Sequence, residues 1–125
     1  MKSRVASFLV VTTLAALVLV SFATAQKKDE QAELLMQAAH EKQLVEGQLE
    51  EAIRLYKLVV QEHTGNRALA AQALLEMGEC YEKLGNSEAR KAYQRLLRDY
   101  ADQSDQVAEA RRHLTALSDN GATNT

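Results

Sequence analysis

The sequence predicts an all-α protein in which antiparallel helix pairs stack as a short α-solenoid. Its 125 residues contain no proline and only five glycines, and proline inside a helix would cost about 3 kcal/mol. Behind an apolar N-terminal segment, apolar residues recur at steps of three and four, which is the spacing of amphipathic helices. One helical segment is repeated 37 to 38 residues later, and such a period is typical of helix-pair arrays.

The N-terminal segment is expected to be a leader and not part of the fold. Two basic residues precede an apolar run at 5–22, and the small residues Ala23 and Ala25 follow it. This pattern predicts a signal peptide at 1–25 that is cleaved after Ala25, which places the mature chain in the periplasm or outside the cell. Because the apolar run is long, the alternative is a retained inner-membrane anchor that faces the periplasm.

Charge and cysteine content exclude some classes of function. Without the two basic residues of the leader, 13 basic residues stand against 17 acidic ones, a formal charge of −4. An acidic domain binds nucleic acid poorly, because that affinity comes largely from neutralising phosphates. Cys80 is the only cysteine, so an internal disulfide is impossible. We expect it to pack inside a helix, with an intermolecular disulfide as the alternative.

Five helices are predicted after the leader. They cover residues 29–45, 48–63, 67–84, 88–100 and 104–118. Gly47, Gly65 and Gly85 separate successive helices, as glycine does where the chain turns into a left-handed conformation. Asn66 is placed to cap the third helix. The small, polar residues 119–125 are expected to form a disordered tail.

The repeat is visible when Gly47 is aligned with Gly85 and one residue is deleted. Ala52 then falls on Ala89 and Tyr56 on Tyr93. One amphipathic helix pair cannot bury its apolar face alone, whereas stacked pairs bury a continuous core.

This pattern resembles the tetratricopeptide repeat (TPR) family from about residue 33 to 117, and most closely over 74–100. The resemblance implies repeats at 29–66 and 67–103, followed by a capping helix at 104–118. It also assigns structural roles to Ala52, Tyr56, Gly78, Tyr81, Ala89 and Tyr93. In the family, Gly78 would allow close helix contact, Ala89 would fit where the two helices cross, and Tyr93 would fill the gap to the next repeat.

The first repeat departs from the family pattern. His40 and Gln43 stand where the family prefers a small residue and an aromatic, and the proline that commonly closes each repeat is missing. The helix at 29–45 is therefore expected to pack loosely or to act as a cap.

The C-terminal segment carries a second resemblance. Residues 92–117 are similar to the periplasmic repeats of TolA-binding and outer-membrane assembly proteins, and to helical segments that precede TolB-like propellers. The chain is then either a stand-alone repeat domain or a shortened relative of a longer exported protein.

No catalytic, metal or cofactor site is predicted. His40, His63 and His113 fall on three different predicted helices and form no HExxH pattern, whereas a metal needs ligands that converge. No GxSxG elbow and no glycine-rich phosphate loop are present in the sequence. We therefore expect a non-catalytic protein-binding module of the bacterial cell envelope.

The resemblance implies that the first helix of each pair lines a concave groove, which receives an extended or helical segment of another protein. The residues expected in the groove are Leu34, Gln37, Glu41, Leu44, Leu75, Glu79, Glu82, Lys83 and Arg112. Acidic walls with leucine anchors favour a basic, amphipathic segment, and an ordinary solvated face is the alternative.

The fourth predicted helix carries a basic face. Lys91, Arg95 and Arg98 share one face of the fourth helix. We interpret it as a solvated outer face, with docking to an acidic protein or anionic lipid as the alternative.

A structural role is the rival function. Because two repeats barely meet the stability needs of an array, the domain would then self-associate through the helices 29–45 and 104–118.

Overall fold

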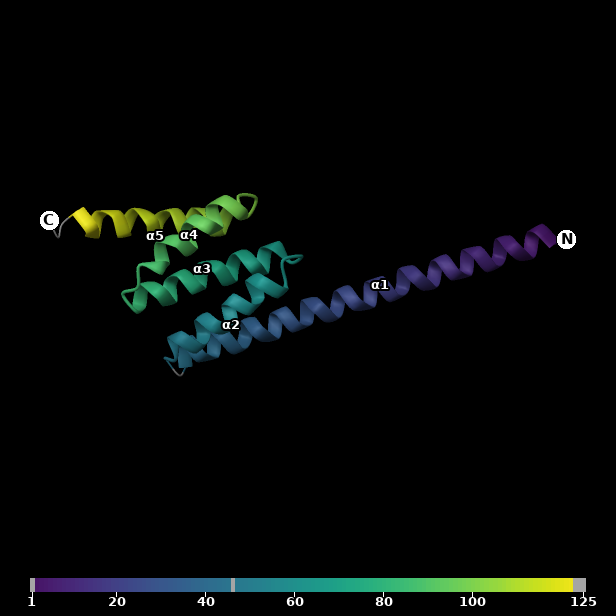
Figure 1. Cartoon of the computed structure of the whole chain (residues 1–125), viewed down its shortest axis with the longest axis horizontal. Helices are drawn as coiled ribbons and strands as arrows, with labels where there is room; N and C mark the ends of the chain where they lie inside the picture. The colour runs from purple at the N-terminus through teal and green to yellow at the C-terminus, as the bar shows by residue number, and fades with distance from the viewer. Residues whose placement is uncertain (1, 46, 123–125) are drawn as a thin grey trace. The chain divides into compact units, whose positions relative to one another are not determined.

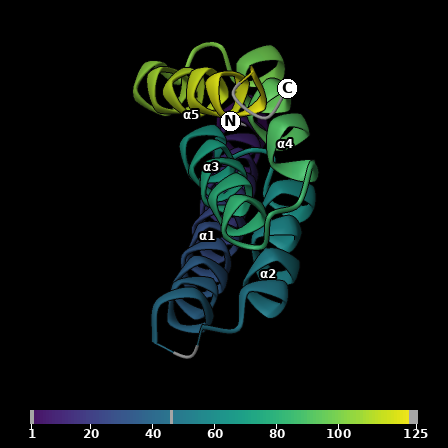
Figure 2. The ribbon, with the colours of Figure 1, turned by 90° about the vertical axis from the view of Figure 1, so that its left-hand side faces the viewer.

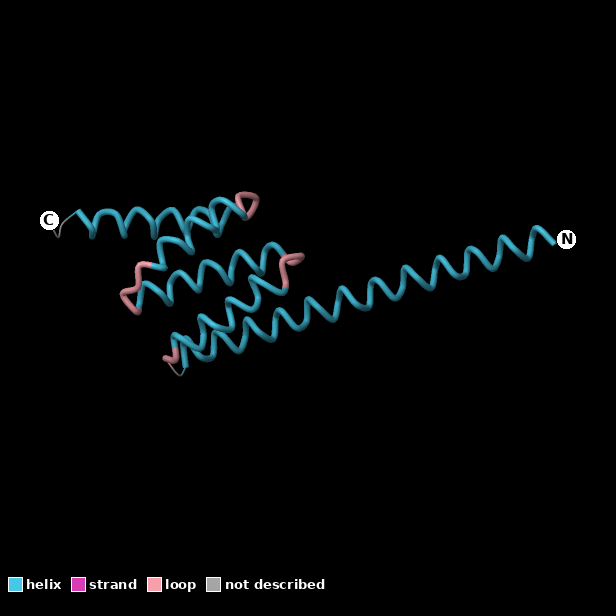
Figure 3. The backbone as a smooth tube through the Cα atoms, viewed as in Figure 1, coloured by secondary structure: helices cyan, strands magenta, loops and turns pink. Residues whose placement is uncertain are grey.

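The computed structural model describes residues 2–45 and 47–122, which form helices joined by short turns (Figure 1, Figure 3). The elements are α1 (Lys2–His40), a π-helical turn η1 (Glu41–Val45), α2 (Leu49–Glu62), α3 (Arg67–Lys83), α4 (Glu88–Asp99) and α5 (Ser104–Ala122). The predicted all-α class is confirmed. The chain divides into two compact units, of which the first ends at Gln31 and the second begins at Ala32.

The first unit is a long, apolar, exposed helix. It contains an 18-residue window with a mean hydropathy of 2.5, none of which is buried. Its length and composition are those of a membrane-spanning helix and equally of a signal sequence. The sequence predicted the first helix to begin at residue 29, whereas α1 begins at Lys2, because no glycine or proline interrupts the chain before Gly47.

The second unit is a stack of antiparallel helix pairs. Each helix packs on the next along the chain, from α2 to α5, and α3 also contacts α5. Viewed as in Figure 2, α3 and α5 lie in one row and α2 and α4 in another. The predicted stacking of sequential antiparallel pairs is confirmed.

Alanines bring these helices close together around two tyrosines. Tyr56 in α2 and Tyr93 in α4 are the two largest fully buried side chains. Around them lie the buried alanines Ala39, Ala52, Ala70, Ala71, Ala73, Ala89, Ala92 and Ala110. A core of small residues with a few large ones requires close packing, so a substitution that changes the side-chain volume by even one methylene alters its stability.

The turns follow from the residues at the helix ends. Gly85 has a φ of 65°, and the N–H groups of Gly85 and Asn86 donate to the carbonyls of Glu82 and Tyr81, both at 2.9 Å. This is a Schellman motif, which needs the left-handed conformation that glycine adopts easily. At the start of α3, the side chain of Asn66 accepts a hydrogen bond from the Leu69 N–H at 3.2 Å, which confirms the predicted cap.

Two further elements differ from the sequence prediction. The end of the predicted first helix is a π-helical turn, η1, in which Gln43 is buried. α5 continues to Ala122, beyond residue 118 where the prediction ended it. The predicted disordered tail therefore overlaps the helix at 119–122, and residues 123–125 lie outside the described residues.

Candidate protein-binding surface

Two of the residues to which the resemblance assigns structural roles, Gly78 and Tyr93, lie in direct contact. A β-carbon built on Gly78 would come within 2.4 Å of the Tyr93 ring, so only glycine leaves room for this ring. Ala89 is buried. Tyr81 is half-buried and packs against the core. The same ring fills the space between α3 and the following α5, because Tyr93 stacks on His113 with ring centroids 4.9 Å apart.

A polar cluster joins α1, α2 and α3. The Tyr56 hydroxyl lies 2.9 Å from Glu76 Oε2 and 2.6 Å from the side-chain amide of Gln43. His40 Nε2 lies 2.6 Å from the same Glu76 oxygen. Gln72 donates to the other Glu76 oxygen at 2.7 Å. His40 and Gln72 thus donate to Glu76, and the single Tyr56 hydroxyl proton is shared between Glu76 and Gln43. Burial, followed by the hydrogen bond and charge of Glu76, raises the pKa of Tyr56 well above its usual range, which keeps the phenol protonated.

A second cluster joins α3, α4 and α5. The Tyr93 hydroxyl donates to Glu82 Oε2 at 2.6 Å, and His113 Nδ1 lies 2.6 Å from the same oxygen. Because a carboxylate only accepts, Nδ1 of His113 carries the proton. Burial and Glu82 raise the pKa of Tyr93 well above its usual range. Each cluster therefore contains one buried tyrosine, one glutamate of α3 and one histidine, and we call them the first and second Tyr–Glu–His clusters.

The repeat places corresponding positions in corresponding contacts. Tyr56 and Tyr93 are 37 residues apart, as are Glu76 and His113. In each repeat the tyrosine of the second helix reaches the residue 20 positions further on, in the next helix of the α3 and α5 row. This regularity explains why the two tyrosines face the same side of the stack.

An incompletely neutralised carboxylate lies between the two clusters. Glu79 stands one turn from both Glu76 and Glu82 on α3. Among the described residues, the closest contact of its carboxylate with a basic nitrogen is a long one, 3.7 Å to His113 Nε2. Burial first, and then the Glu76 charge, raise the pKa of Glu79. Glu109 of α5 lies 3.5 Å from the same histidine nitrogen. We call Glu76, Glu79, Glu82 and Glu109 the acidic face.

The structure separates the residues predicted for the groove into three groups. Glu79 and Glu82 are half-buried and belong to the acidic face. Leu75 is only 6% exposed and packs in the core, so its side chain is not available to an incoming ligand. The remaining predicted residues are exposed, namely Leu34, Gln37, Glu41, Leu44, Lys83 and Arg112. Arg112 pairs with Glu109 at the edge of the acidic face.

The sequence prediction did not include His40, His113 or Gln43 in these clusters. The sequence predicts His40 and His113 as polar or half-exposed helix residues, and Gln43 as a departure from the family pattern. All three contact a buried tyrosine or its glutamate. The offset of 37 residues between Glu76 and His113 was the available signal, since it marks both positions as neighbours of a repeated tyrosine.

Cys80 is buried, as expected for a residue that packs within a helix. Burial raises the pKa of its thiol to about 11, which disfavours the reactive thiolate at neutral pH. Within residues 2–45 and 47–122, no three His, Cys, Asp or Glu side chains are grouped to hold a metal ion.

The Gly78–Tyr93 contact, the Ala89 packing and the Gly85 turn all fall in one stretch of the chain. Residues 72–102 match the family model of the tetratricopeptide repeat. The matched segment contains most of α3, all of α4 and the turn between them. Neither the curated proteins nor the solved structures contain a match to the chain. A tetratricopeptide repeat indicates a module for protein–protein interaction, and it argues only weakly for a non-catalytic role.

Proposed function

We propose that the chain is a non-catalytic protein-binding module of the bacterial cell envelope, and that its acidic face receives a basic segment of another protein. The match to a tetratricopeptide repeat supports the general class. The apolar N-terminal helix supports export, with cleavage after Ala25 or retention as an anchor as the two routes.

The main support for the proposal is that the Glu79 carboxylate is only weakly paired within the fold. Its neighbours Glu76 and Glu82 each accept two or three short hydrogen bonds, whereas Glu79 has a single long contact and a raised pKa. A lysine or arginine of a partner would supply the missing positive charge. Because Glu79 is 30% exposed, such a side chain can reach it while most of the water around it is displaced, and charge pairs gain strength in that setting.

Fluorescence anisotropy tests this proposal with a labelled nonapeptide in which lysine and serine alternate. The full chain is held in nanodiscs of zwitterionic lipid, so that the peptide meets no other strong negative charge. Glu79→Lys should weaken binding at least tenfold and flatten its salt dependence. The matched control is Glu62→Lys at the exposed end of α2, which should leave the affinity within twofold.

Reversal at Glu82 is a poorer test, because Tyr93 and His113 both donate to Glu82 and the variant would damage the fold. Equal affinities for the wild type, Glu79→Lys and Glu62→Lys would reject the acidic face as the binding surface.

Self-association is the second candidate function, favoured by apolar side chains on α1 and η1. Leu34, Leu44 and Val45 are 59%, 71% and 78% exposed, and association with a second copy would remove this apolar surface from water. Light scattering over a dilution series tests this role. Self-association is supported if the measured mass falls with dilution and if Leu44→Ser reduces it to the mass of the monomer. A constant monomer mass would reject self-association.

A further inference from the structure

A second surface, formed by α2, α3 and α4, has the opposite charge. A hollow of about 190 Å³ lies among these helices. Its floor is formed by Leu74 and Met77 of α3 and Ala92 of α4, and Tyr81 lines it as well. Since one water occupies about 30 Å³ of the liquid, the hollow has room for about six waters, or for one large side chain.

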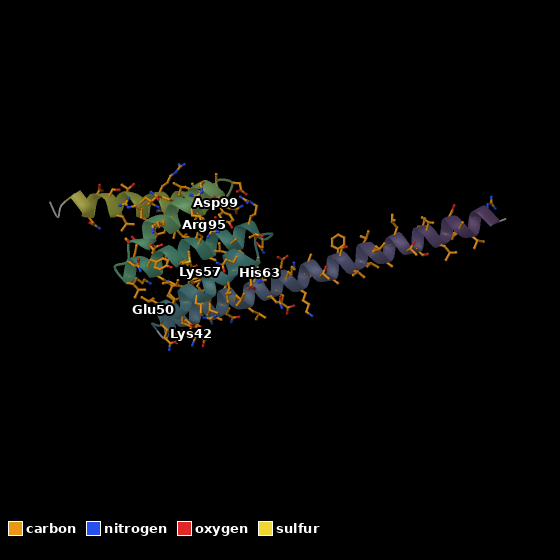
Figure 4. The ribbon with its side chains drawn as sticks, in the orientation of Figure 1. Lys42, Glu50, Lys57, His63, Arg95 and Asp99 are labelled. Carbon is orange, nitrogen blue, oxygen red and sulfur yellow. The ribbon has the colours of Figure 1, made fainter. Side chains whose placement is uncertain are left out.

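Positive charge predominates around this hollow. Lys57, Lys91 and Arg95 line it, against one carboxylate, Glu88. Glu88 is paired with Lys91 at 2.7 Å. Arg95 lies 3.3 Å from Asp99, which it shares with Arg98 at 2.8 Å. Figure 4 labels Lys57 on α2 and the Arg95 and Asp99 pair on α4.

Lys57 differs from the other two cations. Across the described residues, no Asp or Glu lies within ion-pair distance of Lys57. The Tyr81 ring and the Met77 side chain also line the hollow. The hollow therefore combines an apolar floor with two cations that are incompletely neutralised. Among the described residues Lys57 has no carboxylate partner, and Arg95 shares Asp99 with Arg98.

We propose that this hollow binds an acidic segment of a partner protein, with one apolar side chain on the Leu74 and Met77 floor and flanking carboxylates at Lys57 and Arg95. The size of the hollow favours a single side chain, and the excess of cations favours carboxylates beside it. This site is distinct from the acidic face, since it takes the opposite charge and its cations lie on α2 and α4, whereas the glutamates of the acidic face lie on α3 and α5. The domain would then hold two protein segments of opposite charge at once.

The three methionines allow a test that reports position. Met77 lines the hollow, Met36 of α1 does not, and Met1 lies outside the described residues. The full chain, labelled with ¹³C at the methionine methyl groups, is placed in zwitterionic nanodiscs. It is titrated with a capped heptapeptide that has a central leucine between two runs of three glutamates. The Met77 methyl signal should shift with saturation, while the Met36 signal stays in place.

Two variants and two further probes complete the test. Lys57→Glu should weaken the peptide at least tenfold, whereas Arg111→Glu, on the exposed side of α5, should change the affinity less than twofold. A heptapeptide with glutamines in place of glutamates should bind at least tenfold more weakly. An unmoved Met77 signal, equal binding of both peptides, or a Met77 shift caused only by phosphatidylglycerol vesicles would overturn the proposal, and the last result would indicate a lipid surface.

Discussion

The ring of Tyr93 lies so close to the backbone of Gly78 that a β-carbon at Gly78 would come within 2.4 Å of Tyr93 Cε1. Both residues are enclosed in the core, and Tyr93 is also held by Glu82 and His113, so the ring cannot move aside without losing those contacts. We predict that Gly78→Ala destabilises the domain by about 1–3 kcal/mol, the usual cost of overpacking. Urea unfolding followed by circular dichroism measures this change.

Gly121 provides the control for the first prediction. It lies in α5, and a β-carbon there would meet no atom within 4 Å. Because alanine favours the helix over glycine by up to about 1 kcal/mol, Gly121→Ala should leave stability unchanged or raise it slightly. Equal effects of the two substitutions would mean that Tyr93 does not pack on Gly78.

The ring and the hydroxyl of Tyr93 make separate contributions. Tyr93→Phe keeps the ring and removes the hydrogen bond to Glu82, for which we expect a loss of about 1.5–3 kcal/mol, as for bonds to charged groups. Tyr93→Ala also removes the ring and should cost about 3–5 kcal/mol or unfold the domain. Thermal unfolding separates the two variants, and a melting temperature within two degrees of the wild type for Tyr93→Ala would indicate an exposed ring.

Arg67 connects the start of α3 with the turn between α4 and α5. Its Nε donates to Asp102 Oδ2 at 2.9 Å, its Nη2 donates to the Asp99 carbonyl at 2.9 Å, and its guanidinium lies 5.0 Å from the Tyr100 ring centroid. The Arg67 bond, followed by that from Gln103, holds the pKa of Asp102 well below its usual range. A lowered pKa stabilises the fold above the unfolded value of about 3.9, and this contribution is lost as the pH falls.

At pH 7 the urea concentration at the unfolding midpoint should therefore be higher for the wild type than for Asp102→Asn. The difference should shrink as the pH falls below about 4. Urea titrations between pH 2 and 7 check this expectation. The pair is exposed, so the difference should be small and should decrease with salt. A difference that does not change with pH would contradict the role of this carboxylate.

Glu79 should have the opposite dependence on pH. Because its pKa is raised in the folded protein, its ionised form destabilises the fold, and stability increases as the pH falls through the raised pKa toward the unfolded value of about 4.3. Glu79→Gln should raise the urea midpoint at pH 7, and this gain should vanish below about pH 4. A variant that is less stable than the wild type at pH 7 would show that the Glu79 charge is compensated within the fold.

The sequence predicted the elements that depend on local chemistry and on the repeat. The helices from Leu49 onward, the Gly85 turn and the Asn66 cap follow from periodicity and from the residues at helix ends. The buried positions of Tyr56, Tyr93 and Ala89 follow from the repeat, because equivalent positions occupy equivalent environments.

The rest depended on contacts between distant residues. Leu75 is adjacent to Leu74, and both are buried. Periodicity alone does not distinguish a leucine that faces the core from a leucine that faces a groove. His40 contacts Glu76, which lies 36 residues later in the chain, and His113 contacts Glu82, which lies 31 residues earlier. No local sequence pattern predicts such contacts. The π-helical turn at Glu41–Val45 also lacks a sequence signature.

The central claim is that the glutamates of α3 and α5 form the surface to which a basic segment binds. Backbone amide NMR during titration with the lysine–serine peptide tests it most directly. We predict shifts confined to residues 72–83 and 105–113, with the outward residues of α2, such as Arg54 and Lys57, unaffected. Shifts centred on α2 and α4, or no shifts at saturating peptide, would contradict the account.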